Sequence, residues 1–99
     1  MQIIDIHTHI YPSKIAVKAT DSVRDFYQLR GSGNMDGTVE LLRQRGALAG
    51  ISRYTVLPVS NSPERVHSIN SFILEQTGIH QDFIGFGTVH AAMNDIEEE

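Results

Sequence analysis

Residues 1–12, MQIIDIHTHIYP, carry the strongest indication of the fold. The segment opens with isoleucines, and because β-branched residues favour strands, residues 2–6 are predicted to form a short buried strand. Two histidines, His7 and His9, follow with one residue between them. Pro12 then ends the extended segment, since proline lacks an amide hydrogen. The segment therefore predicts a strand whose C-terminal end carries two imidazoles.

Helices and strands are predicted to alternate along the rest of the sequence. Apolar residues at helical spacing, or runs of β-branched and aromatic residues, mark each element. The predicted helices are residues 14–29, 38–49 and 62–77, the predicted strands are 53–60 and 82–90, and a glycine-rich loop is expected at 31–34. Strands joined by helical crossovers pair in parallel. The pattern predicts an α/β fold built of parallel βα units.

The third predicted helix has the clearest boundaries. Ser62 is predicted to cap its start, and Gly78 is predicted to follow its end. Its inward stripe is predicted to consist of Val66, Ile69 and Ile73. At the other end of the chain, the acids that follow Asn94 predict the first turn of a further helix.

Composition excludes several classes of protein. The chain has 99 residues, which suit a single small domain, with 40% hydrophobic and 20% charged residues. The formal net charge of -4 argues against nucleic-acid binding, and no apolar run approaches the roughly 20 residues of a membrane span. There is no cysteine, so thiolate ligands and disulfides are excluded. We expect a soluble, cytoplasmic protein.

The histidine pair is the strongest chemical signal. Residues two apart in a strand share one face, so Asp5, His7 and His9 are expected to project together from the polar end of the strand. Two imidazoles in this arrangement can converge on one ion, and zinc binds imidazole nitrogen readily. Parallel α/β proteins carry their chemistry at the C-terminal ends of strands, where these histidines fall. Asp5 is predicted to support the ligands from behind. The opposite face is expected to pack under helices, and its members are Ile4, Ile6, Thr8 and Ile10.

Residues that follow the other predicted strands are weaker candidates. His90 follows the last strand and could contact substrate, although a surface histidine explains it equally well. Asn61, with Ser60, follows the second strand at the same edge of the sheet. Tyr11 could line the mouth of a pocket, but packing is the simpler role.

The motif Asp5-Ile6-His7-Thr8-His9, followed by alternating helices and strands and by FIGFGTVH at 83–90, resembles the start of the amidohydrolase superfamily. The resemblance is to its amidohydrolase-related branch, also called amidohydrolase 2. It implies a (β/α)₈ barrel of the TIM type, in which His7 and His9 bind a divalent metal, usually zinc. The implied activity is hydrolysis of C–N or C–O bonds of a small substrate by metal-activated water. Non-oxidative decarboxylation at the same kind of site is the alternative within the family.

A complete barrel of this type needs about 250 residues. Residues 1–99 supply three strands, so we expect them to be the N-terminal part of a single, truncated metal-dependent hydrolase barrel domain. The resemblance implies that the remaining ligands and the catalytic base lie on later strands.

Two other interpretations stay open. A phosphoesterase of the polymerase-and-histidinol-phosphatase type also opens with a His-x-His strand, but it usually has a further histidine motif after its second strand, which VLPVSNS (56–62) lacks. A non-catalytic fragment could instead associate through the open edge of its sheet. Association through such an edge also predicts a homo-oligomer.

Overall fold

The structure is a computed structural model that describes residues 1–28 and 36–99. The loop predicted at 31–34 lies outside the described residues. The described residues form three strands and three α-helices, with a short 3₁₀ turn before the last helix and another near the C-terminus. The elements in chain order are β1 (Ile3–Thr8), α1 (Ala16–Phe26), α2 (Val39–Leu48), β2 (Ile51–Val56), η1 (Pro63–Arg65), α3 (Val66–Ile79), β3 (Phe83–Gly85) and η2 (Ile96–Glu98).

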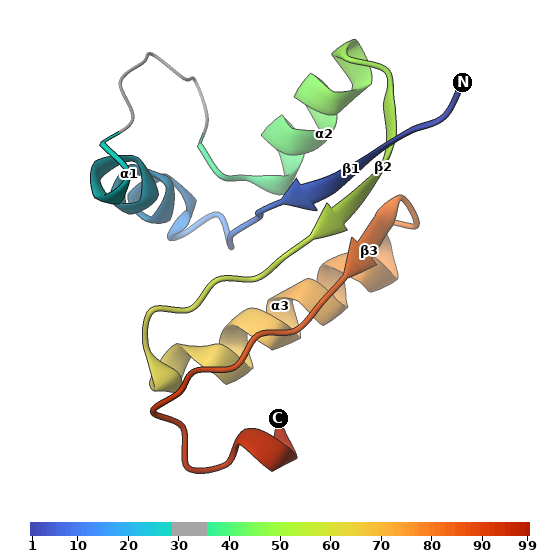
Figure 1. Cartoon of the computed structure of the whole chain (residues 1–99). Helices are drawn as coiled ribbons and strands as arrows, with labels where there is room; N and C mark the ends of the chain where they lie inside the picture. Colours follow the sequence, from blue (N-terminus) through green and yellow to red (C-terminus); the bar gives the residue numbers. More distant parts are fainter. Residues whose placement is uncertain (29–35) are drawn as a thin grey trace.

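The strands form one parallel sheet in the order β1-β2-β3 (Figure 1). Tyr54 of β2 pairs with Asp5 of β1 on one side and with Phe83 of β3 on the other. The predicted α/β organisation with parallel strands is therefore confirmed. All three strands end at the same edge of the sheet, because parallel strands run in one direction.

The core lies between the sheet and the two helices α2 and α3, which pack on β2 and β3 respectively. Figure 1 shows α1 set apart from this layer, beyond the C-terminal end of β1. Val66, Ile69 and Ile73 are buried, as the sequence predicts. The core cluster consists of Ile10, Val39, Tyr54, Val56, Ile73 and Phe83.

The strand boundaries differ from the prediction. β1 continues through His7 to Thr8, and β2 begins at Ile51 and ends at Val56, two residues before Pro58. β3 pairs over Phe83–Gly85 only, although a strand was predicted over 82–90. Sequence periodicity identifies an extended segment, whereas pairing requires a neighbouring backbone at the right distance.

The helix boundaries also depend on details that the sequence only suggests. The Thr38 hydroxyl oxygen accepts a hydrogen bond from the Leu41 amide, so Thr38 caps α2. Gly50, with φ of 78°, follows the C-terminal end of α2 in the left-handed conformation that favours glycine. Ser62 makes no side-chain capping bond, and the helical segment begins as a 3₁₀ turn. The prediction that Gly78 follows α3 is wrong, because the helix continues to Ile79.

The two faces of β1 are only partly covered. Thr8 and Ile10 are buried, as predicted for the face that packs under helices. Ile4 and Ile6 on the same face are 47% and 76% exposed, because no described helix covers this end of the strand. The apolar side of α1 is likewise open, with Phe26 79% exposed.

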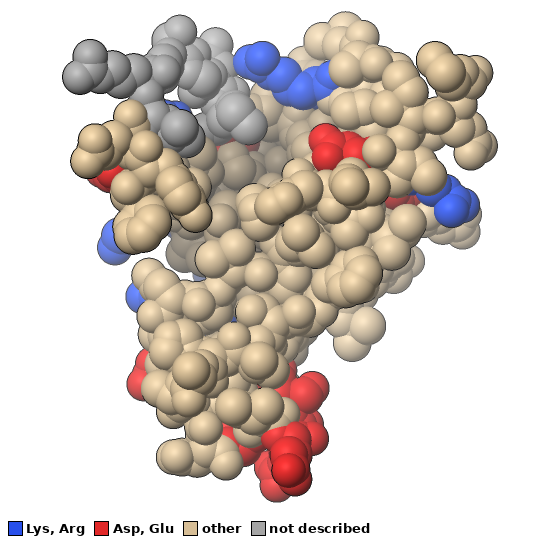
Figure 2. Space-filling view, viewed as in Figure 1, with Lys and Arg blue, Asp and Glu red and all other residues tan. Residues whose placement is uncertain are grey.

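Charged groups are spread unevenly over the surface. Figure 2 shows acidic side chains gathered at the tip of the molecule formed by the C-terminal turn, where η2 contributes Glu97 and Glu98. The predicted helix start after Asn94 is a 3₁₀ turn over Ile96–Glu98.

Within the described ranges, no helix has the length and apolar character needed to cross a membrane.

Candidate functional site

The two histidines at the end of β1 point toward one another. The Nε2 atoms of His7 and His9 are 3.1 Å apart, and the ring planes meet at 80° with their centroids 4.9 Å apart. Both side chains are exposed. The strand therefore presents two imidazole nitrogens close to one point in space, at the C-terminal edge of the sheet.

The His9 ring is fixed by β2. Its Nδ1 lies 2.8 Å from the Leu57 carbonyl oxygen. A carbonyl oxygen can only accept, so Nδ1 carries the hydrogen and donates it, and in the neutral ring the lone pair is on Nε2. Nε2 of His9 can then accept a hydrogen bond from Nε2–H of His7, or bind an ion.

Asp5 lies two residues before His7 and is half-buried. Its carboxylate oxygen Oδ1 accepts a hydrogen bond of 3.1 Å from the His7 backbone amide. The carboxylate therefore holds the backbone of the first histidine. The contact is made with the main chain of His7, whereas the predicted role of Asp5 was to support metal ligands.

Tyr11 packs inside the molecule. Its side chain is buried, and its backbone amide donates to the Gly37 carbonyl over 2.9 Å. Burial raises the pKa of its phenol above the usual 10.0. The structure places Tyr11 in the packing role that the sequence also allowed, where it joins the exit of β1 to the segment before α2.

Asn61 and Ser60 lie after the end of β2. Asn61 is exposed, while the half-buried Ser60 hydroxyl donates to the Ser62 carbonyl over 2.7 Å. The Ser60 bond shapes the turn into η1. Asn61 is accessible to solvent just before η1, five residues beyond the end of β2.

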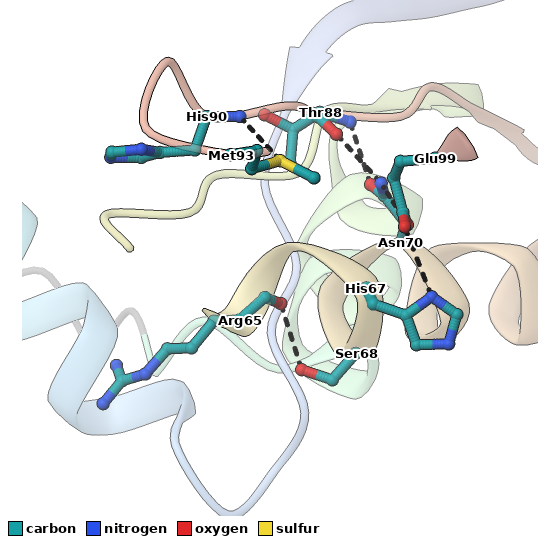
Figure 3. A network of polar contacts seen from close by, with 8 residues as sticks. All are labelled: Arg65, His67, Ser68, Asn70, Thr88, His90, Met93 and Glu99. Atoms are coloured by element: carbon teal, nitrogen blue, oxygen red, sulfur yellow. Dashed lines mark hydrogen bonds and ion pairs between the residues drawn. The ribbon is translucent and has the colours of Figure 1, made fainter. Parts of the chain in front are cut away.

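His90 lies five residues beyond β3, in a segment held by α3 (Figure 3). Its backbone amide contacts the Met93 sulfur at 3.2 Å, and its Nδ1 accepts a hydrogen bond of 3.1 Å from the Ala92 amide. An Nδ1 that accepts leaves the hydrogen of a neutral ring on Nε2. His90 therefore offers a hydrogen-bond donor, unlike His9, which offers a lone pair.

The side chain of Asn70 holds the segment that leads to His90. Its Nδ2 donates to the Thr88 carbonyl over 2.9 Å, and its Oδ1 accepts from the Thr88 amide over 2.8 Å (Figure 3). Nδ2 also lies 3.1 Å from a carboxylate oxygen of Glu99. Asn70 was not singled out from the sequence, because nothing in a helical pattern marks an amide that pairs with a distant backbone.

The structure brings together His7, His9 and Asp5, and it leaves His90 and Asn61 without a hydrogen bond to them. Over residues 1–28 and 36–99, no three side chains of the metal-binding types form a group that could hold an ion. A shallow hollow between the start of α3 and the C-terminal turn involves other residues, among them Glu64, His67 and Asp95. The histidine pair has two imidazoles, whereas catalytic zinc sites usually have three protein ligands.

Comparison with family models, with curated proteins and with solved structures found no match to this chain.

Proposed function

We propose that residues 1–99 are the N-terminal, three-strand part of a metal-dependent, amidohydrolase-type barrel, and that His7 and His9 are two of its metal ligands. The ion we expect is zinc. The reaction we expect is hydrolysis of a C–N or C–O bond in a small substrate. The resemblance of Asp5-Ile6-His7-Thr8-His9 to that family suggests the proposal, and the geometry of the pair supports it.

The observation that carries the proposal is the distance of 3.1 Å between the two Nε2 atoms. In tetrahedral zinc sites, bonds of about 2.0–2.1 Å place neighbouring nitrogens about 3.3 Å apart. The pair is thus within a few tenths of an ångström of the spacing that zinc needs. The hydrogen bond from His9 Nδ1 to a backbone carbonyl is also typical of metal-binding histidines.

The sheet supports the barrel part of the proposal. Three consecutive parallel strands in the order β1-β2-β3 are the arrangement with which a (β/α)₈ barrel begins. The histidines are at the C-terminal edge of this sheet, where such barrels place their active sites. Both facts would also fit an open parallel sheet, so the histidine geometry carries more weight.

Each residue has a definite role in the proposal. His7 and His9 bind the ion through Nε2, and Asp5 holds the backbone of His7. His90 is proposed to donate from Nε2 to an oxygen of the substrate. A bound divalent ion would supply activation of water and polarisation of the substrate carbonyl.

Zinc titration of the full chain by isothermal calorimetry tests the proposal. We expect saturable binding at one site, and a loss of at least about tenfold in affinity when His7→Ala and His9→Ala are combined, because two coordinating nitrogens are removed. His67→Ala is the matched control, since its side chain is 84% exposed and lies outside the pair. If the double variant binds zinc as tightly as the unmodified chain, the assignment of His7 and His9 as ligands is wrong.

A further inference from the structure

Thr8 stands between the two histidines and faces the other way. It is buried, at 7% exposure, while the two histidines are exposed. Its hydroxyl donates a hydrogen bond of 2.8 Å to the Thr55 carbonyl of β2. A buried hydroxyl that finds a backbone acceptor on the neighbouring strand fixes the two strands relative to one another.

Leu57 completes the connection between the two strands. Its amide donates to the Thr8 carbonyl over 2.8 Å, and its own carbonyl accepts from His9 Nδ1 over 2.8 Å. The three hydrogen bonds therefore tie residues 8–9, at the end of β1, to residues 55–57, at the end of β2. The orientation of the His9 ring depends on where β2 places the Leu57 carbonyl.

The pairing of β1 with β2 is irregular at this end of β1. The register shifts between Asp5 and Thr8, a stretch that contains His7, and regular pairing resumes where Thr8 faces Val56. A slip of one residue would exchange the two faces of the strand, so contacts that fix the register here also fix which way the histidines point. The Thr8 hydroxyl forms its bond at the point where the register is restored.

We propose that Thr8 is a positioning residue for the metal site: its bond to Thr55 keeps the Leu57 carbonyl in place for His9 Nδ1, and so keeps Nε2 turned toward His7. This inference rests on the proposed function. Neighbours that orient a metal-binding histidine typically change metal affinity by 10–100-fold when removed.

The test compares Thr8→Val with Thr8→Ser in the full chain. Valine has nearly the same shape as threonine but no donor, whereas serine keeps the hydroxyl. We expect zinc affinity to fall about tenfold in Thr8→Val and to stay within about threefold in Thr8→Ser. A nitrogen NMR spectrum of the His9 ring in the metal-free chain should show Nδ1–H as the dominant tautomer with threonine or serine, and a mixture of tautomers with valine.

Thr77→Val is the matched control. It removes a comparable hydroxyl-to-carbonyl bond, of 2.9 Å to Leu74, within α3 and away from the histidines. Zinc affinity and the His9 spectrum should be unchanged in this variant. If Thr8→Val does not unfold cooperatively in urea, Thr8→Ala replaces it, because alanine also lacks the hydroxyl and adds no zinc ligand.

The possible outcomes separate the two proposals. If the unmodified chain does not bind zinc, the proposed function fails. If the unmodified chain binds zinc and Thr8→Val binds equally well with the same His9 tautomer, the role of Thr8 is refuted while the metal site stands. Reduced affinity in Thr77→Val as well would also refute it, because the effect would then be a general loss of stability.

Discussion

Gly46 is the residue at which the core has least room for a side chain. It is buried in α2, and a Cβ atom at this position would overlap the Tyr54 hydroxyl and lie 2.5 Å from its Cζ. Tyr54 is itself buried and pairs edge-to-face with Phe83, at a centroid distance of 5.8 Å. The packing of α2 on β2 therefore depends on glycine at this position.

Gly46→Ala should lower the free energy of unfolding by about 1–3 kcal/mol, because the added methyl group overpacks a buried site. Gly78→Ala is the matched control, since a Cβ in that turn of α3 meets nothing within 4 Å. The control should gain about 0.5–1 kcal/mol from the higher helix propensity of alanine. Urea unfolding measures both, and equal stabilities would contradict the packing argument.

Tyr54 makes stability depend on pH in the alkaline range. Burial, followed by the negative charge of Asp82, raises the pKa of its phenol above the usual 10.0. The folded chain therefore keeps the proton at pH values where the unfolded chain has lost it. The stabilisation is complete below about pH 10 and falls as the pH rises above it, by at most about 1.4 kcal/mol per pH unit.

Urea unfolding between pH 8 and 11 checks this dependence. Lysines also titrate in this range, so the informative quantity is the difference between the unmodified chain and Tyr54→Phe. We expect the alkaline loss to be shallower in the variant. Superimposable slopes would mean that the Tyr54 phenol has no raised pKa.

At the residue scale, sequence patterns predicted the buried stripe of α3. Val66, Ile69 and Ile73 are buried in α3, which packs on β3 and runs beside the segment that follows it (Figure 1). Phe26 follows the same helical spacing yet is exposed, since α1 lies beyond the strand end. Periodicity shows which side of a helix is apolar, whereas the packing partner is set by tertiary structure.

At the scale of elements, the segment after β3 is held by a side chain in place of a strand. Backbone pairing with β2 ends soon after Gly85, where the Phe86 amide donates to the Val56 carbonyl over 3.2 Å. Beyond that point Asn70 supplies both a donor and an acceptor to Thr88. The amide of α3 thereby takes the place of a neighbouring strand.

Asn70→Ala should release this segment. The Thr88 amide would lose its acceptor, and we expect its hydrogen exchange to speed up about tenfold, which corresponds to the roughly 1.4 kcal/mol of one lost bond. Hydrogen exchange followed by NMR gives the measurement. Asn61→Ala, at an exposed position after β2, is the control and should leave the Thr88 rate unchanged. Unchanged protection in Asn70→Ala would show that the segment is held by other contacts.

Helix and strand ends were less predictable than the elements themselves. Ser62-Pro63 marks the right place but opens a 3₁₀ turn, and the glycine at 78 does not stop α3. The predicted strand at 82–90 is extended over much of its length, but its pairing depends on a neighbour that the local sequence does not reveal.

At the scale of the whole molecule, the sheet has two open edges. Among residues 1–28 and 36–99, β1 and β3 each pair on one side, and β1 also leaves Ile4 and Ile6 exposed. Open strands with exposed apolar residues favour pairing with another chain. This is the part of the molecule through which we expect a homo-oligomer to form.

Ile6→Lys should reduce self-association, because a lysine on an edge strand opposes pairing. Light scattering coupled to size exclusion, over a range of concentrations, should show a rising mean mass for the unmodified chain and a smaller rise for the variant. Leu74→Lys is the control, since Leu74 is 75% exposed on α3 and Ile6 is 76% exposed on β1. A concentration-independent monomer in all three chains would contradict association through the edge.

The candidate site was predictable in part. The spacing of His7 and His9 in a strand was enough to expect two converging imidazoles. The contact between His9 and Leu57 could not be predicted. It is made by the Leu57 backbone carbonyl, which reaches the His9 ring through the pairing of two strands far apart in the sequence. Thr8 was expected on the buried face, but its bond to Thr55 depends on the same register.

The hydrogen bond between His9 and Leu57 spans 48 residues of chain, a separation that includes α1 and α2. During folding the imidazole can take up this orientation only after β1 has paired with β2, and such non-local pairing is slow compared with helix formation. An ion that arrives earlier would meet two rings that rotate independently. The rate of tight metal uptake during refolding would therefore follow the joining of the first two strands.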